Sequence, residues 1–440
     1  MTSYWCEQAW LPPGQVSAGV RVDVHSGQII GVTPSADPDG SVRLAGLVLP
    51  GLANAHSHAF HRALRGRTQH ERGSFWTWRE QMYAVADRLD PDSYLALARA
   101  TYAEMALAGI TCVGEFHYLH HGPGGSPYAD PNAMGLVLLQ AAAEAGIRIT
   151  LLDTCYLAGG IGRPLAATQA RFGDGDASRW AERVSALSTS DGARMGAALH
   201  SVRAVPVGQM DPVVQWAESS SAPLHIHLSE QVAENEQSLA AHGVTPTRLL
   251  ADHGVLGERT TAVHGTHLTP DDRLLLGRSG SGVCFCPTTE RDLADGIGPA
   301  RALASAGSPL SLGSDSHATI DLFEESRAVE LDERLATRQR GHFDVRELLA
   351  MATVNGHRAL GWPQAGVLAP GAPADLVAVR LDSVRTAGGR DRPAETVVFA
   401  AGASDVSDVV VGGRPVVRDG QHLLVPDVGR ALCQAIDAVT

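Results

Sequence analysis

Histidines and acidic residues recur at the ends of short apolar runs in this chain. His56 and His58 follow one apolar run, and His225 and His227 lie in another. Residues two apart on a β-strand point to the same side, so each pair can present two imidazoles to one place. Imidazole nitrogens are common zinc ligands, and two of them make half of a typical site. A single His-x-His pair is a weak signal, because surface pairs also arise by chance.

Two more apolar runs end in residues of the same kind. His264 ends one run, and Asp315 and His317 follow another. Each of these residues taken alone is more often structural or solvated. Four runs that end alike indicate a shared metal site, provided that the fold brings their ends together. Glu230, three residues beyond His227, adds a carboxylate that could move a proton.

The segments between these residues favour a parallel barrel. Apolar strand candidates alternate with Ala- and Leu-rich helical stretches over roughly 310 residues, which suits a closed (β/α)8 TIM-type barrel of the α/β class better than an open doubly wound sheet. The carboxyl ends of all strands would then meet at the barrel mouth. No Gly-x-Gly-x-x-Gly follows the first strand, so a dinucleotide fold is not supported. The predicted strands are Val48–Ala55, Thr111–Phe116, Arg148–Asp153, Met195–Ser201, Pro223–Leu228, Thr261–Gly265, Gly282–Cys286 and Leu310–Gly313.

Both ends of the chain differ from the middle. Residues 17–33 resemble a β-hairpin, and residues 374–379 and 406–417 resemble short strands with tight glycine turns. We therefore predict a small β-sandwich domain formed by both termini, although two unrelated hairpins packed on the core would give the same pattern. The predicted parts are 1–49 for the N-terminal part of the β domain, 50–365 for the barrel and 366–440 for the C-terminal part.

Composition and charge exclude several classes of protein. The chain has 440 residues, of which 44% are hydrophobic and 19% charged, as in a globular protein. Its net charge is −13 and no basic block stands out, which argues against nucleic acid or an anionic membrane as partner. Six cysteines are too few for a disulfide scaffold, and neither a signal peptide nor a spanning segment is found. We expect a cytoplasmic protein, and a homodimer stays open.

The motifs resemble those of the amidohydrolase superfamily over nearly the whole chain, and in particular its mononuclear deaminases, which carry His-x-His-x-x-Glu at the fifth strand. The resemblance implies that one Zn²⁺ ion is bound. His225 is no ligand in that pattern, and we expect it to be an oriented histidine behind the site. The implied ligands are His56, His58, His227 and Asp315, and the implied catalytic residues are His264, Glu230 and Asp315.

The chemistry of these residue types agrees with such a site. Zinc lowers the pKa of a bound water toward about 7. Asp315 could accept the proton of the water, and Glu230 could pass a proton to the leaving nitrogen. His264 could stabilise the tetrahedral centre. The expected reaction is hydrolysis of a C=N bond with release of ammonia.

Several loops are similar to those of the N-formimino-L-glutamate deiminases, hydrolases that act on a linear amidine in histidine degradation. The similar segments are 58–64, 75–80, 114–121 and 200–203. The resemblance implies a small dianionic substrate, which would become N-formyl-L-glutamate and ammonia. Arginine can bind a carboxylate through two parallel hydrogen bonds, which suits this substrate. The implied substrate contacts are His61, Arg79, Tyr118, His200 and Arg203.

One position departs from the deiminase pattern, and two other functions stay open. His61 stands where the deiminase motif often has Gln; both donate a hydrogen bond, but histidine can also become charged. A different amidohydrolase could act on a cyclic purine or pyrimidine amidine, which needs an apolar slot rather than two arginines. A metal-binding protein without catalysis is the second alternative, and it would have no use for Glu230 and His264.

Overall fold

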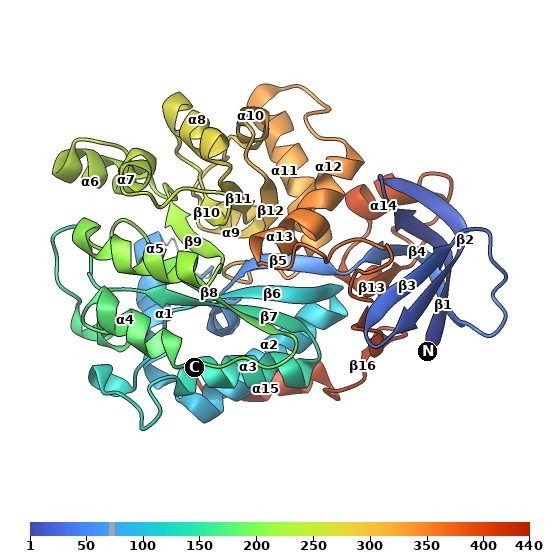
Figure 1. Ribbon diagram of the computed structural model, residues 1–440, viewed down its shortest axis with the longest axis horizontal. Coiled ribbons are helices and arrows are strands. Elements are labelled where there is room, and N and C mark those ends of the chain that lie inside the picture. The colour runs from blue at the N-terminus through green and yellow to red at the C-terminus, as the bar shows by residue number, and fades with distance from the viewer. Residues whose placement is uncertain (70–74) are drawn as a thin grey trace.

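The computed structural model describes residues 1–69 and 75–440. The predicted barrel is confirmed: eight strands form one parallel sheet in chain order, from β5 to β12. Figure 1 shows this sheet surrounded by helices, with a second sheet beside it. The barrel strands are β5 (Leu52–Ser57), β6 (Ile110–His117), β7 (Arg148–Cys155), β8 (Ala193–Leu199), β9 (Leu224–Leu228), β10 (Thr260–His264), β11 (Gly282–Phe285) and β12 (Leu310–Leu312).

The barrel is nearly closed by contacts between its first and last strands. Ser57, at the end of β5, pairs in parallel with Asp315, which follows β12. The backbone N–H of Asp315 donates to the carbonyl of His56 at 3.0 Å, and that of His58 donates to the carbonyl of Asp315 at 3.3 Å. These two hydrogen bonds therefore join the strands at the barrel mouth.

Helices cover the barrel, and their ends follow local sequence rules. Asp90 caps the second helix, where its carboxylate accepts a hydrogen bond from the N–H of Ser93 at 2.8 Å. Gly146, with φ of 77°, ends the third helix. The helices are α1 (Phe75–Arg88), α2 (Pro91–Leu107), α3 (Ala133–Ala145), α4 (Ala177–Ser185), α5 (Met210–Ser219), α6 (Val232–His242), α7 (Pro246–Asp252), α8 (Pro270–Ser279), α9 (Pro287–Asp292), α10 (Ala300–Ala306), α11 (Leu322–Thr337), α12 (Val345–Ala350) and α13 (Gly356–Ala359).

The two ends of the chain form a second sheet together, as predicted. Strand β4 pairs with β1 on one side and with β13 on the other, which joins the terminal segments. The sheet curls on itself, because Gly27 lies against Gly412, and it encloses a core of its own. The division after residues 49 and 365 stays a prediction. The strands are β1 (Thr2–Leu11), β2 (Gln15–His25), β3 (Gln28–Thr33), β4 (Val42–Pro50), β13 (Leu376–Val379), β14 (Val406–Val411), β15 (Arg414–Arg418) and β16 (Gln421–His422).

The last two helices belong to the C-terminal segment but pack against helices of the barrel. Helix α14 (Pro393–Ala400) contacts α11 and α12, and helix α15 (Val428–Asp437) contacts α2. In Figure 1, α15 lies below the barrel near α2 and α3. The C-terminal segment therefore contributes to both bodies of the molecule.

Gly51 separates the two sheets. The sequence predicts one strand over Val48–Ala55, but β4 ends at Pro50 and β5 begins at Leu52. A Cβ atom at Gly51 would lie 2.1 Å from the side-chain oxygen of Thr111, so only glycine fits there. The apolar run continues through this break because both strands are buried, which is why the pattern did not reveal it.

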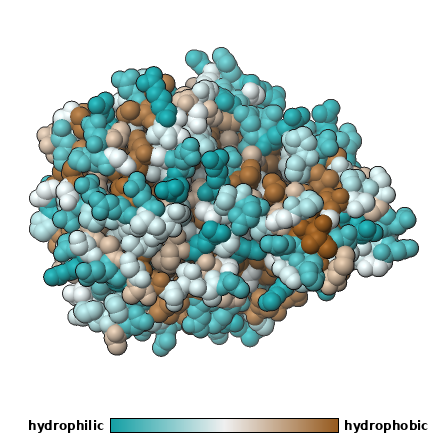
Figure 2. Space-filling view, in the orientation of Figure 1, coloured by the Kyte–Doolittle hydropathy of each residue, from teal (hydrophilic) through white to brown (hydrophobic). Residues whose placement is uncertain are grey.

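The outer surface carries scattered hydrophobic residues. Large exposed ones such as Leu335 and Val384 lie on separate elements. In Figure 2, hydrophobic residues show in small groups among hydrophilic ones. Within the part of the chain that the structure describes, no helix is long and apolar enough to cross a membrane.

The junction between the sheets can be tested with Gly51→Ala. The added methyl group would collide with the side chain of Thr111, and overpacking of this kind costs about 1–3 kcal/mol. Denaturant unfolding should show a loss of this size in the free energy of unfolding. Gly208→Ala is the control, because nothing lies within 4 Å of its added Cβ. Equal stability of both variants would contradict the close packing at Gly51.

Candidate active site

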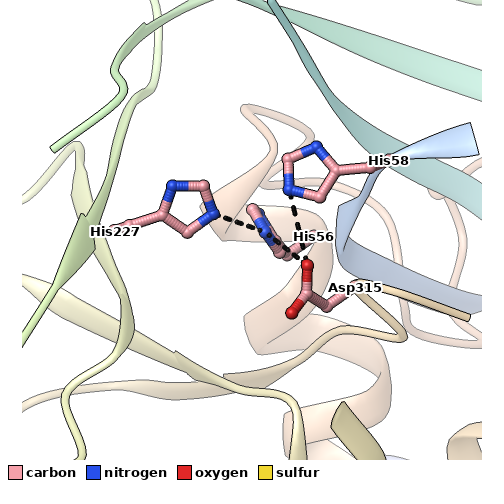
Figure 3. Close-up of side chains that lie close together, drawn as sticks. All are labelled: His56, His58, His227 and Asp315. Carbon is pink, nitrogen blue, oxygen red and sulfur yellow. Dashed lines mark hydrogen bonds and ion pairs between the residues drawn. The ribbon is translucent and has the colours of Figure 1, made fainter. Parts of the chain in front are cut away.

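Four side chains from the ends of three barrel strands meet at the barrel mouth. His56 and His58 lie on β5, His227 lies on β9, and Asp315 follows β12. One ligand atom from each residue lies within 4.8 Å of the others, and all four residues are buried. Figure 3 shows the three rings and the carboxylate pointing toward one another. The structure thus brings together the four residues that the sequence nominated as metal ligands.

The spacing within this group can be compared with that of a zinc site. The Nε2 atoms of His56 and His58 lie 3.3 and 3.4 Å from Oδ1 of Asp315, and the Nε2 atoms of His56 and His227 lie 3.1 Å apart. Zinc ligands at about 2.0–2.1 Å in a tetrahedron lie about 3.3 Å from one another. Three imidazoles and one carboxylate of this spacing fit a single zinc ion.

Backbone carbonyls orient two of the rings. Nδ1 of His58 lies 2.9 Å from the carbonyl oxygen of Phe116, and Nδ1 of His227 lies 2.9 Å from that of His200. When Nδ1 donates to a carbonyl, Nε2 keeps its lone pair for a metal. Burial lowers the pKa of both rings, to about 3 for His58, so they are neutral at pH 7. Neutral imidazole is the form that binds metal.

The carboxylate of the group is ionised and its backbone is strained. Burial alone would raise the pKa of Asp315, but the hydrogen bond and charge of His56, with His264 and His58, outweigh burial and lower the pKa. The φ angles of Asp315 and His264 are 42° and 70°. Such left-handed conformations are unusual outside glycine and cluster at functional sites. The hydrogen bonds that close the barrel hold Asp315 in this conformation.

Two predicted catalytic residues lie next to the group. Nε2 of His264 is 3.8 Å from Oε1 of Glu230 and 3.7 Å from Oδ2 of Asp315. Burial opposes a charge on His264, but Glu230, Glu290 and Asp315 raise its pKa well above the usual value. Burial also raises the pKa of Glu230, while His264 and Arg203 act against this. The site therefore offers a cationic imidazole beside a carboxyl group that can exchange a proton.

Glu290 is a site residue that the sequence analysis missed. Its Oε1 lies 3.3 Å from Nδ1 of His264 and accepts a hydrogen bond from the backbone N–H of Cys286 at 2.9 Å. It therefore fixes the orientation of the His264 ring. A usable signal was present, because Pro287, Thr288, Thr289 and Glu290 directly follow the seventh predicted strand, whose end is at the same mouth.

Glu115 is a second residue to which the sequence gave no role. Its carboxylate accepts hydrogen bonds from the backbone N–H of Ala59 and the hydroxyl of Ser57, both at 2.7 Å. Burial raises the pKa of Glu115 to about 7, while these hydrogen bonds act in the opposite direction. The two bonds lie on either side of His58, so Glu115 fixes the turn that carries this ring.

A cavity of about 440 Å³ opens onto the four-residue group. All five residues predicted to contact substrate line it, together with Glu230 and His264. Trp78 also lines the cavity, whereas the side chains of Phe75 and Trp76 lie outside the described part of the chain. Arg163, to which no sequence pattern pointed, supplies another guanidinium group at the cavity wall. The predicted contact residues are His61, Arg79, Tyr118, His200 and Arg203.

Arg203 is held in place by acidic neighbours. Its Nε donates to Glu234 at 2.8 Å, and its Nη2 lies 3.7 Å from Glu230. Burial opposes the charge of Arg203, but Glu234 and Glu230 raise its pKa, so it stays cationic. Glu234, another residue missed from the sequence, also accepts from the N–H of Ser229 at 2.8 Å. The Nε side of the guanidinium group is therefore hydrogen-bonded within the protein, while Arg203 still lines the cavity.

His61 is neutral in this structure. Its Nε2 lies 2.9 Å from the hydroxyl of Tyr118. Burial, with the nearby imidazole of His58, lowers the pKa of His61 well below its usual value. The ring therefore acts as an uncharged hydrogen-bonding group at pH 7, as a glutamine would.

Other histidines contact different partners. Nε2 of His225 lies 2.9 Å from the carbonyl oxygen of Ala359, away from the four-residue group. His117, His120 and Asp153 form another buried cluster with a spacing that could suit a metal. In this cluster Arg183 already donates to both oxygens of Asp153, at 2.7 and 2.9 Å. A guanidinium therefore occupies the place of a cation there.

Comparisons with known proteins agree with this geometry. Residues 47–416 match the model of the Amidohydrolase family. A formimidoylglutamate deiminase of Pseudomonas aeruginosa is 37% identical, with 99% of each chain covered. The crystal structure of an amidohydrolase from Brucella melitensis has a TM-score of 0.91 at 34% identity, covering 100% of both chains. An adenosine deaminase from Xanthomonas campestris with bound zinc shares the fold, with a TM-score of 0.85 at 24% identity and coverage of 99% and 97%. The chain therefore belongs to the amidohydrolase family and is a hydrolase that acts on carbon–nitrogen bonds.

Proposed function

We propose that this enzyme hydrolyses N-formimino-L-glutamate to N-formyl-L-glutamate and ammonia, as a step of histidine degradation. The observation that carries the proposal is a single cavity that holds both a hydrolytic group and several cations. His58, His227 and Asp315 of the four-residue group line it together with Glu230 and His264, and three arginines line the same space. The likeness to a formimidoylglutamate deiminase over 99% of both chains supports the same substrate.

We infer that one zinc ion is bound by His56, His58, His227 and Asp315. The fit rests on the donor types, on their spacing of 3.1–3.4 Å and on the rings held by backbone carbonyls. When bound, the ion would activate water and polarise the C=N group as a Lewis acid. Its presence in a related adenosine deaminase agrees with this choice of metal.

The protein groups then divide the proton transfers between them. Ionised Asp315 takes a proton from the attacking water as the new C–O bond forms. Cationic His264 stabilises the charge of the tetrahedral centre by hydrogen bonding. Glu230 delivers a proton to the formimino nitrogen and is reprotonated with the proton that Asp315 took. When the hydroxyl group of the tetrahedral centre loses the second proton of the water, that proton also reaches the nitrogen through the two carboxylates, so the C–N bond breaks and ammonia leaves. The carbon retains the oxygen as a formyl group.

The substrate carboxylates explain the cations of the cavity. The protein carries a net charge of −13, so a dianion needs local positive charge in order to bind. Arg79, Arg163 and Arg203 provide this charge at one cavity. A purine or pyrimidine amidine would gain nothing from several guanidinium groups. The arginines therefore favour the linear dianionic amidine over the cyclic alternatives.

The substrate can be tested by measuring ammonia release from a panel of amidines. N-formimino-L-glutamate should be the best substrate, and N-formiminoglycine, which has one carboxylate, should be clearly poorer. Adenosine, guanine and cytosine should release no ammonia above background. Turnover of a nucleobase without turnover of formiminoglutamate would overturn the proposed substrate while leaving the hydrolase assignment intact.

Metal content should depend on His227 and not on His225. His227→Ala removes one of four proposed ligands and should lose most of the bound zinc, as measured by mass spectrometry of the purified protein. His225→Ala is the matched control, because this residue lies on the same strand but contacts Ala359 instead. Full zinc occupancy and full activity in His227→Ala would show that the ligand assignment is wrong.

Glu230→Gln should keep the metal and lose turnover. The amide cannot deliver a proton, so kcat should fall by about two to four orders of magnitude, the usual contribution of general acid–base catalysis. Glu236→Gln, at an exposed position of α6, should keep the wild-type rate. A near-normal kcat in Glu230→Gln would assign the proton transfer to another group.

Arg203→Ala should weaken transition-state stabilisation for formiminoglutamate by about 2–5 kcal/mol. The reason is that it removes a buried charge pair between the guanidinium group and a substrate carboxylate. The measurement is kcat/KM for formiminoglutamate and for formiminoglycine, and the larger loss is expected for the dianion. Arg248→Ala is the control: it breaks an exposed ion pair with Asp252 and should change transition-state stabilisation by about 0–1 kcal/mol at most. Equal losses for both substrates would argue against a carboxylate contact at Arg203.

A further inference from the structure

We propose that the amino-terminal end of the barrel carries a second binding site, for a small organic carboxylate. A cavity of about 340 Å³ lies there, against the starts of β10, β11 and β12. Thr261, Gly282 and Ser311 contribute from these strands, and residues around Ala359 close the other side. The site is independent of the proposed reaction.

This cavity is separate from the catalytic one. The two share no lining residue. Leu360 and Trp362 belong to a buried apolar cluster with residues of the barrel strands, such as Ala55 and Val263. A Cβ atom at Gly114 would lie 2.3 Å from the side chain of Leu360, so Leu360 packs tightly inside the barrel. We call Leu360 and Trp362 the plug. A ligand in the cavity at the amino-terminal end of the barrel, here called the lower cavity, therefore cannot reach the catalytic group.

Positive charge gathers at the lower cavity. Arg194, Arg259 and Arg358 line it, and Glu258 is its one lining carboxylate. Within residues 1–69 and 75–440, none of these three arginines forms an ion pair. An excess of cations in a protein of net charge −13 is unusual and would attract an anion.

Arg194 is held ready for a ligand. Its guanidinium carbon lies 4.2 Å from the centre of the Trp362 ring, and Nε1 of Trp362 donates to the hydroxyl of Thr150 at 3.0 Å. Nε of Arg194 is nevertheless buried without a hydrogen-bond partner. A buried polar group that lacks a partner is costly, so an acceptor brought by a ligand would satisfy it.

Ser311 gives a second, independent indication. Ser311 is only 2% exposed, lines the cavity, and has a hydroxyl without a hydrogen-bond partner. The neighbouring wall is apolar and includes Pro223, Pro309 and Leu310. One hydroxyl, a planar guanidinium and an apolar wall fit a carboxylate on a short hydrocarbon body. A bare anion would leave the apolar wall uncovered.

The test uses the full-length, metal-loaded protein and benzoate as the probe, with binding measured by calorimetry. Benzyl alcohol tests whether the charge is needed, and inorganic phosphate tests whether the apolar body is needed. Benzoate should bind, and both comparison compounds should bind at least about tenfold more weakly. Equal binding of benzyl alcohol or of phosphate would overturn the assignment of a carboxylate site, and absence of benzoate binding would overturn the site itself.

Two matched variants locate the binding. Arg194→Met should weaken benzoate at least about tenfold, whereas Arg203→Met makes the same change at the catalytic cavity and should leave this binding intact. Loss in Arg203→Met with retention in Arg194→Met would place benzoate in the catalytic cavity and refute the proposal. Ser311→Ala, a smaller change, should weaken benzoate by about threefold, so it keeps the test valid if Arg194→Met does not fold. Unchanged affinity in Ser311→Ala and Arg358→Met would equally refute it.

Discussion

The hydrogen bonds between the first and last barrel strands are the constraint on which the site depends. The backbone of Asp315 bonds on one side to His56 and on the other to His58, at 3.0 and 3.3 Å. These bonds close the barrel and also set a carboxylate between two imidazoles that lie far away in sequence. The strained backbone of Asp315 is tolerated because closure of the barrel fixes it on both sides.

Burial governs the chemistry of this site. It keeps the histidines of the four-residue group neutral, the form that can bind a metal, and it raises the pKa of Glu230. Specific neighbours reverse this effect where a charge is needed. Three carboxylates raise the pKa of His264, and Glu234 keeps Arg203 cationic. The same barrel mouth thus holds neutral and charged groups within a few ångströms.

The chain first passes from the terminal sheet into the barrel at Gly51. Gly51 allows the chain to pass from β4 to β5 against Thr111, and its N–H donates to the carbonyl of Asp375 at 3.0 Å. This bond connects the N-terminal strand to the C-terminal part of the chain just below the strand that carries His56. The terminal segments therefore support the barrel from beside its lower end, away from the mouth.

The sequence by itself determined the barrel, the joint terminal sheet and the ligand candidates. Strand and helix periodicity are local, and the polar residues at strand ends are visible as motifs. The resemblance to a family supplied the roles proposed for His264 and Glu230. The tertiary structure alone decided the rest, because it depends on side chains that meet from distant segments. Glu290 against His264, Glu234 against Arg203, and the plug formed by Leu360 have no local pattern, and the neutrality of His61 follows from burial that no motif records.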